Sequence, residues 1–95
     1  MPTYAILQIN ITNKENYKEY LNQVTKIVTK HQGEYIIRGG KSEVVLGKWN
    51  YQRTVVVKFP SYDAAEKCYK SPPYQKAWSL AKNSTERNFQ IIEGV

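Results

Sequence analysis

The clearest pattern in the chain is an alternation of apolar and mixed positions over residues 3–11, which read TYAILQINI. Side chains at every second position share one face of a strand, so the pattern predicts a β-strand with one apolar face. Apolar residues at steps of three and four follow, and they predict an amphipathic helix of about five turns. We expect a capping box of Thr12 and Glu15 to begin this helix and Gly33 to end it in the left-handed conformation.

The rest of the chain repeats both periods. We expect an extended segment at Glu34–Arg38 that bends at Gly39-Gly40 and resumes at Glu43–Leu46, because paired glycines within a strand suggest a bulge. The remaining predicted elements are a strand at Arg53–Phe59, a helical region capped by Ser61 and interrupted at Ser71-Pro72-Pro73, and a last strand at Arg87–Ile92.

The order strand, helix, strand, strand, helix, strand predicts one α+β domain over residues 1–95 with a ferredoxin-like βαββαβ fold. Right-handed crossovers would place both helices on one face of a four-stranded antiparallel sheet. The helix-facing set is expected to be Leu7, Ile9, Val55, Val57, Phe59, Phe89 and Ile91. The opposite face is expected to carry Tyr4, Ile6, Gln8, Ile36, Arg38, Thr54, Val56, Lys58, Gln90 and Ile92. Because this second face mixes aliphatic and polar residues, we expect it to meet a partner chain or to line a cavity.

The net charge of +6 comes from 14 basic and 8 acidic residues. The lysines are dispersed along the chain rather than grouped, which is typical of a solvated surface and disfavours nucleic-acid binding. The one cysteine, Cys68, excludes an internal disulfide. No signal peptide or membrane-length apolar run is visible, so a cytoplasmic protein without membrane contact is expected.

Several short motifs resemble, in order and spacing, a small bacterial family, the domain of unknown function family 1330. They are Tyr35-Ile36-Ile37-Arg38-Gly39-Gly40, Leu46-Gly47-Lys48-Trp49, Arg53, Phe59-Pro60-Ser61, Ala65, Ser71-Pro72-Pro73-Tyr74-Gln75 and Glu93-Gly94. The resemblance covers nearly the whole chain. It implies membership of the dimeric α+β barrel superfamily, in which two ferredoxin-like sheets face each other across a homodimer. Leu46 and Lys58 stand where the family often has glutamate, so the resemblance transfers no catalytic carboxylate to these positions.

Arg38 and Arg53 are the strongest candidates for a binding site. Arg38 interrupts an apolar strand pattern, and a desolvated guanidinium needs a partner. The partner can be a ligand carboxylate or phosphate held in a forked hydrogen bond. The alternative is a structural ion pair, within the chain or between subunits, with Glu43 or Glu93.

Glu43, Trp49 and Tyr74 complete the candidate ligand-binding set. Trp49 can stack on a planar ligand or anchor a loop, and Tyr74 can point its hydroxyl into a cavity or pack in the core. His31, at the end of a helix, has the position of a capping or packing residue. No catalytic residue, metal site or cofactor is predicted, because one histidine and one cysteine cannot complete a zinc site.

Three function classes are compatible with these residues. The first is binding of a small, anionic molecule in a pocket, with cofactor-independent turnover as its enzymatic form. The second is a purely structural or interaction homodimer. The third, nucleic-acid binding, is disfavoured further because the third strand, RTVVVKF, lacks the stacking aromatic residues of an RNA-binding sheet. The sequence predicts neither the identity of the ligand nor whether the protein is an enzyme.

Overall fold

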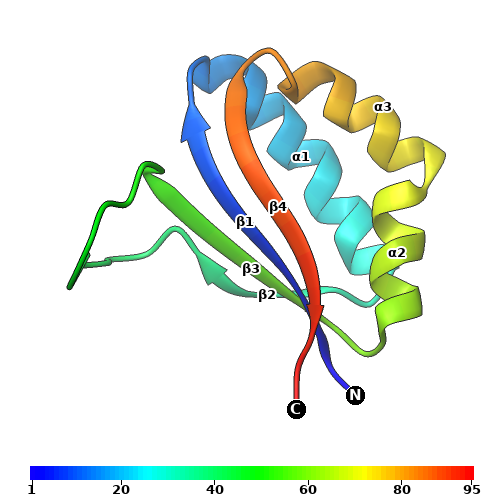
Figure 1. Cartoon of the computed structure of the whole chain (residues 1–95). Coiled ribbons are helices and arrows are strands. Elements are labelled where there is room, and N and C mark those ends of the chain that lie inside the picture. Colours follow the sequence, from blue (N-terminus) through cyan, green and yellow to red (C-terminus); the bar gives the residue numbers. More distant parts are fainter.

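The computed structural model describes residues 1–95 and confirms the ferredoxin-like α+β fold. The four strands form one antiparallel sheet in the order β2-β3-β1-β4, and all helices cover one face of it (Figure 1). The predicted second helical region is two helices that meet at Ser71. The elements are β1 (Thr3–Ile11), α1 (Lys14–Lys30), β2 (Glu34–Arg38), β3 (Arg53–Phe59), α2 (Tyr62–Lys70), α3 (Pro72–Ala81) and β4 (Thr85–Glu93).

Short polar side chains begin each helix. Ser61 and Ser71 cap α2 and α3 by accepting hydrogen bonds from Ala64 and Tyr74. The predicted capping box at the start of α1 is wrong by one residue, because Asn13 is the cap and its side chain accepts from Asn16 N–H at 3.1 Å. Asparagine stabilises a helix N-terminus at least as well as threonine does. Its acceptor oxygen also lies one bond further from its own backbone.

The end of α1 also differs from the prediction. Gln32, with φ of 66°, is the left-handed residue, and Gly33 follows it with its N–H bonded to the carbonyl of Val28 at 2.9 Å. Gly33 is needed for space instead, because a Cβ there would lie 2.5 Å from Val28 and 2.9 Å from Phe59. The glycine therefore lets α1 turn closely against β3.

The core lies between the helices and the central strands. Most of the predicted helix-facing residues are buried, with Phe59 fully so. Ile91 is half-buried, and Phe89 is exposed at 36%, although its ring still contacts Tyr69 with centroids 4.6 Å apart. Four buried positions on α1, namely Tyr17, Tyr20, Val24 and Val28, complete the core from above the sheet.

A bulge in β2 overturns the predicted placement of Arg38. Tyr35 pairs with Val57, but Ile37 pairs with Val56 and Arg38 with Val55, so Ile36 is an extra residue. The extra residue reverses the alternation from Ile37 onward, and Arg38 joins the helix-facing side that carries Val55. The sequence prediction placed the bend further along the chain, at the paired glycines.

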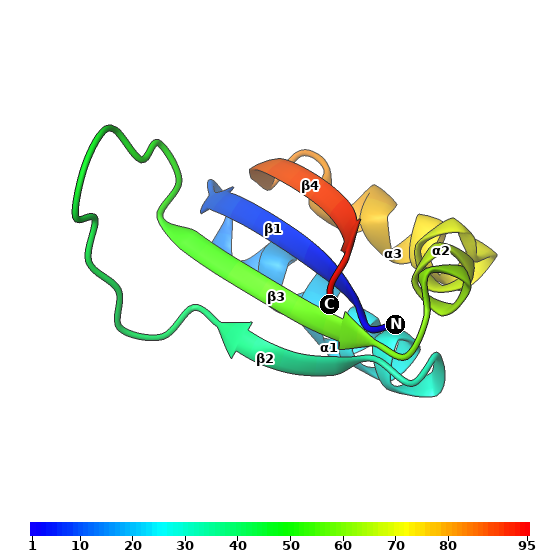
Figure 2. The ribbon, with the colours of Figure 1, turned by 60° about the horizontal axis from the view of Figure 1, so that its bottom comes forward.

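The predicted strand at Glu43–Leu46 does not form. Residues 39–52 make one long loop that extends away from the sheet (Figure 2). Its tip exposes Val45 and Leu46, and Trp49 is half exposed. Without a neighbouring strand, the apolar residues of this segment have no ladder to join.

A substitution at Gly33 tests the close packing of α1 on β3. We expect Gly33→Ala to lower the free energy of unfolding by about 1–3 kcal/mol, because the new methyl group must displace Val28 or Phe59. Gly40→Ala is the matched control, since a Cβ at Gly40 meets no atom within 4 Å. Urea denaturation midpoints of the two variants measure the difference. Equal midpoints would contradict the packing described here.

Candidate functional site

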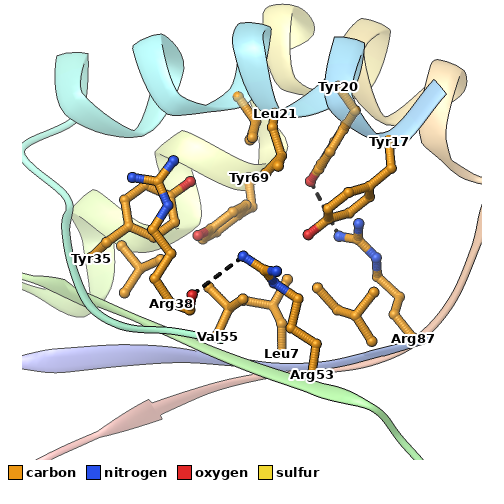
Figure 3. A pocket seen from close by; sticks show the side chains of 13 residues that line it. Leu7, Tyr17, Tyr20, Leu21, Tyr35, Arg38, Arg53, Val55, Tyr69 and Arg87 are labelled. Atoms are coloured by element: carbon orange, nitrogen blue, oxygen red, sulfur yellow. Dashed lines mark hydrogen bonds between the residues drawn. The ribbon is translucent and has the colours of Figure 1, made fainter. Parts of the chain in front are cut away.

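A small cavity of about 30 Å³ lies between α1 and the sheet (Figure 3). Its apolar lining comes from β1, β3 and α1, and its polar lining consists of arginine and tyrosine side chains. No acidic residue lines it. The lining residues are Leu7, Ile9, Tyr17, Tyr20, Leu21, Val24, Tyr35, Arg38, Arg53, Val55, Val57, Tyr69 and Arg87.

Two arginines flank the floor of the cavity. Arg53 on β3 and Arg87 on β4 are both paired with Ile9 on β1, so the three residues form one row across the sheet. Paired residues of neighbouring strands point to the same face, and Ile9 is buried beneath α1. Both half-buried guanidinium groups therefore lie on the helix side, one on each side of Ile9.

Arg38 lies at the rim of the cavity. Its guanidinium carbon is 4.8 Å from the centre of the Tyr35 ring, on the same face of β2, in a cation–π arrangement. The backbone oxygen of Arg38 accepts a hydrogen bond of 3.3 Å from Arg53 Nη2. The side chain of Arg38 is largely exposed, so water can solvate it from the outer side.

Gly39 makes room for Arg53. Its φ is +69°, and a Cβ at this position would lie 2.7 Å from the guanidinium carbon of Arg53. Any side chain here would push the guanidinium aside, besides being strained by the backbone conformation. The bulge and the glycine together place Arg38 and Arg53 next to each other.

Arg87 is held by aromatic side chains from α1 and α3. Its Nη1 donates to the hydroxyl oxygens of Tyr20 at 3.2 Å and Tyr74 at 3.4 Å, which are themselves 3.0 Å apart. Its guanidinium carbon lies 4.2 Å from the ring centre of Trp78. These contacts fix the position of Arg87 without neutralising its charge.

None of the three arginines forms an ion pair. The ion pairs of the chain are Lys67–Asp63 and Lys70–Glu66, both on the exposed face of α2. The structural pairing with Glu43 or Glu93, considered from the sequence, does not form within the chain. In addition, the Nε atom of Arg53 and the Nε and Nη2 atoms of Arg87 are buried without a hydrogen-bond partner. Buried charged donors without acceptors are costly, so these atoms mark where an anion would be most stabilised.

Burial favours the protonated form of four tyrosine hydroxyls at or behind the cavity. Burial raises the pKa of the Tyr17 hydroxyl above its ordinary value of 10.0, although Arg53 and Arg87 act in the opposite direction. Burial likewise raises the pKa values of Tyr35, Tyr69 and Tyr74. The hydroxyl of Tyr17 lies between the guanidinium groups of Arg53 and Arg87 in Figure 3. It can therefore donate a hydrogen bond to an anion placed between them.

The structure separates the predicted site residues into three groups. Arg53 and Arg38 line the cavity, whereas Tyr74 lies behind it and contacts it through Tyr20 and Arg87. Glu43 and Trp49 belong to the loop of residues 39–52 and line a larger, open hollow of about 950 Å³. Arg38 and Arg53 border both spaces, so the cavity and the hollow adjoin at these two residues.

Arg87 is the main residue that sequence reasoning missed. Arg87 is separated from Phe89 and from Ile91 by an even number of positions, so its side chain points to the same face of β4. The alternation had assigned Phe89 and Ile91 to the helix side. On β3, Arg53 likewise points to the same face as Val55 and Val57. Extending each alternation by one residue would have placed both arginines beneath α1.

Other reactive groups lie outside the cavity. The Nδ1 atom of His31 is 2.9 Å from the carbonyl oxygen of Ile27, which is the capping position expected for it. Burial raises the pKa of the Cys68 thiol to about 12, which leaves little thiolate for nucleophilic chemistry. No group of His, Cys, Asp or Glu side chains is arranged to hold a metal ion. None of the helices has the length and apolar character to cross a membrane.

Comparison with known proteins decides the family. The model of the domain of unknown function family 1330 (DUF1330) matches residues 2–95. The chain belongs to this family. The resemblance seen in the sequence motifs is therefore confirmed, and the DUF1330 protein has no match among curated proteins.

Solved structures similar to this DUF1330 chain share its fold at low sequence identity. A protein of unknown function from Rhodopseudomonas palustris is 12% identical, with a TM-score of 0.83, and the match covers 99% of this chain and 82% of that one. A dimeric ferredoxin-like protein of unknown function from Jannaschia sp. is 12% identical, with a TM-score of 0.78 and coverage of 99% and 100%. SnoaB, a cofactor-independent oxygenase from Streptomyces nogalater, is 6% identical, with a TM-score of 0.63 and coverage of 99% and 93%.

The neutral tyrosines predict a specific alkaline transition. The unfolded chain ionises its tyrosines near pH 10, whereas Tyr17, Tyr35, Tyr69 and Tyr74 resist ionisation in the folded state. The stability from these groups is thus complete below pH 10 and is lost as the pH rises above it. We expect part of the phenolate absorbance to appear only together with the loss of circular dichroism. Full ionisation of all tyrosines in a still folded chain would refute this.

Proposed function

We propose that this DUF1330 protein binds a small anionic molecule in the cavity between α1 and the sheet. The observation that supports this most is the pair of half-buried arginines, Arg53 and Arg87, with no carboxylate of the chain beside them. A guanidinium fork matches the geometry of a carboxylate or phosphate and gives short, charge-assisted hydrogen bonds. An anion would therefore supply the acceptors that the chain itself does not.

The cavity also selects for a partly apolar ligand. Leu7, Ile9 and Val55 form its floor, and Leu21 and Val24 close it from α1. A carboxylate attached to a short carbon skeleton would satisfy both the charges and the apolar surface. Sites for small molecules commonly combine a mainly apolar lining with a few placed polar groups.

Cofactor-independent turnover is the second candidate function. It is favoured by the hydroxyl of Tyr17, which faces the cavity in its neutral form beside two cations. Such a group can donate a hydrogen bond to an oxygen on which negative charge develops, and the arginines would stabilise that charge. The similar fold of SnoaB, a cofactor-independent oxygenase, is consistent with this kind of chemistry in a related scaffold.

We also infer that the protein is a homodimer through the open face of the sheet. Ile37, Val56 and Ile6 form a paired apolar row on that face, which no helix covers (Figure 1). Similar structures from Jannaschia sp. and Thermobifida fusca are described as dimeric ferredoxin-like proteins. This face mixes apolar side chains with polar ones, whereas a solvent-facing sheet is mainly polar, which favours a sheet-to-sheet interface of about 1,600 Å² or more for a stable dimer.

Arginine variants test the binding proposal. We expect Arg53→Gln and Arg87→Gln each to weaken the binding of small carboxylates by about 10- to 100-fold, the cost of a lost charged hydrogen bond. Isothermal titration calorimetry against a panel of small carboxylates measures this. Lys76→Gln is the matched control, since it removes the same charge from an exposed position on α3.

The control makes the result interpretable. Binding that is reduced equally by Lys76→Gln would indicate a general charge effect and would contradict a site in the cavity. No carboxylate or phosphate binding by the wild-type chain at millimolar concentration would also overturn the proposal. Thermal melts of each variant without ligand establish that it is folded.

A matched pair of charge insertions tests the dimer. Ile37 on the open face and Leu80 on α3 have similar exposures, 48% and 42%. We expect Ile37→Glu to shift the protein to a monomer in sedimentation velocity, because the charge would be buried between two sheets. Leu80→Glu should leave the sedimentation coefficient unchanged. A wild-type monomer at micromolar concentration would contradict the inferred homodimer.

A further inference from the structure

The three guanidinium groups of the cavity lie in a line across the sheet. In Figure 3, Arg38 lies at one side, Arg53 in the centre and Arg87 at the other side. The strand order agrees, because Arg38 is on the edge strand β2, Arg53 on β3 and Arg87 on the opposite edge strand β4. Arg38 pairs with Val55, two residues along β3 from Arg53, so the line crosses the strands obliquely. The line begins at the exposed rim of the cavity and ends beneath Tyr17 and Tyr20.

This arrangement offers two positions for an anionic group. The inner position is above Ile9, where Arg53 and Arg87 approach from either side and Tyr17 from α1. The outer position is at the rim, where the side chain of Arg38 lines the cavity and the side chain of Arg53 reaches the backbone oxygen of Arg38. Neighbouring strands are about 4.8 Å apart, so the backbones of Arg53 and Arg87 are separated by about 10 Å and their long side chains can reach one anion together.

The charges favour a ligand with two negative groups. Arg53 and Arg87 bring two positive charges into the half-buried region, Arg38 adds a third at the rim, and no lining residue is acidic. A monoanion between Arg53 and Arg87 would meet both guanidinium groups but bring one negative charge against two half-buried positive ones, and it would leave Arg38 without an anionic partner. Two carboxylates, one at each position, would give every guanidinium an acceptor.

The size of the cavity sets the length of the ligand. A volume of about 30 Å³ holds roughly two water-sized groups, so one carboxylate fills the inner position. The rest of the molecule must extend to the rim, where Arg38 and Arg53 also border the hollow framed by residues 39–52. A short chain of carbons would lie over Val55 and Leu7 between the two charged ends.

We propose that the ligand of this site is a short dicarboxylate, with one carboxylate between Arg53 and Arg87 and the other at Arg38. This rests on the proposed function and makes it specific. It also gives Arg38 a different role from that of the two inner arginines. Arg38 recognises the second carboxylate, whereas Arg53 and Arg87 hold the first.

The test compares each dicarboxylate with its own monoamide. Malonate, succinate and glutarate are titrated into the full chain by calorimetry at fixed ionic strength, beside malonamate, succinamate and glutaramate. The pairs have the same size and shape and differ by one charge. We expect at least one dicarboxylate to bind about tenfold or more tightly than its monoamide, the effect of one charged hydrogen bond.

Two variants separate the inner and outer positions. Arg38→Gln changes an exposed side chain, so it should preserve the fold, and it should abolish the preference for the dicarboxylate while leaving monoamide binding unchanged. Arg87→Gln should weaken the dicarboxylate and the monoamide by the same factor. Lys76→Gln should change neither.

The outcomes distinguish the two proposals. If every monoamide binds as tightly as its dicarboxylate and Arg87→Gln weakens both, anion binding stands and the dicarboxylate inference fails. If inorganic phosphate binds more tightly than all three dicarboxylates, both charges belong at the inner position and the inference also fails. If none of these anions binds, the proposed function fails as well.

Discussion

A guanidinium group removed from water requires acceptors, and this constraint acts on Arg53 and Arg87 more than on any other part of the chain. Both lie on the buried side of the sheet, at either side of Ile9, and both have buried N–H groups without partners. The chain provides aromatic faces and hydroxyl groups around Arg87, but no carboxylate. Aromatic contacts and neutral acceptors make a buried cation tolerable while leaving its charge available to a ligand.

Several features of the fold hold these two cations beneath α1. Gly33 lets the helix turn closely over β3, and the bulge at Ile36 turns Arg38 to the same side. Gly39 then leaves the space that the Arg53 side chain occupies. The hydroxyl of Tyr17 lies between the two cations, and burial raises its pKa so that it stays protonated. The sheet thus has two distinct faces, one that carries the core and the arginines under the helices and one with an apolar row on the open side. The proposed ligand and the proposed second copy would therefore bind on opposite faces.

Periodicity in the sequence was enough to predict the fold and half of the site. The alternation in β1, β3 and β4 and the helical steps in α1 identified the layers, and the DUF1330 motifs agreed. Arg38 was assigned to the wrong face because the bulge adds one residue to β2 and no particular residue type marks its position in the sequence. Arg87 was missed because it precedes the apolar part of β4, where alternation is hard to recognise. The prediction of a strand at Glu43–Leu46 was wrong because β-forming residues also occur in loops when no partner strand is present.

Nuclear magnetic resonance of the arginine side chains tests the central claim most directly. The Nε–H signals of Arg53 and Arg87 report on these groups one at a time, and they can be followed while succinate is added. We predict that both signals shift as succinate is added until the site is saturated. We also predict that the exchange of these N–H protons with water slows, because the anion supplies the missing acceptors. Unchanged Arg53 and Arg87 signals, while exposed lysine signals move with succinate, would show that the two cations do not form a binding site.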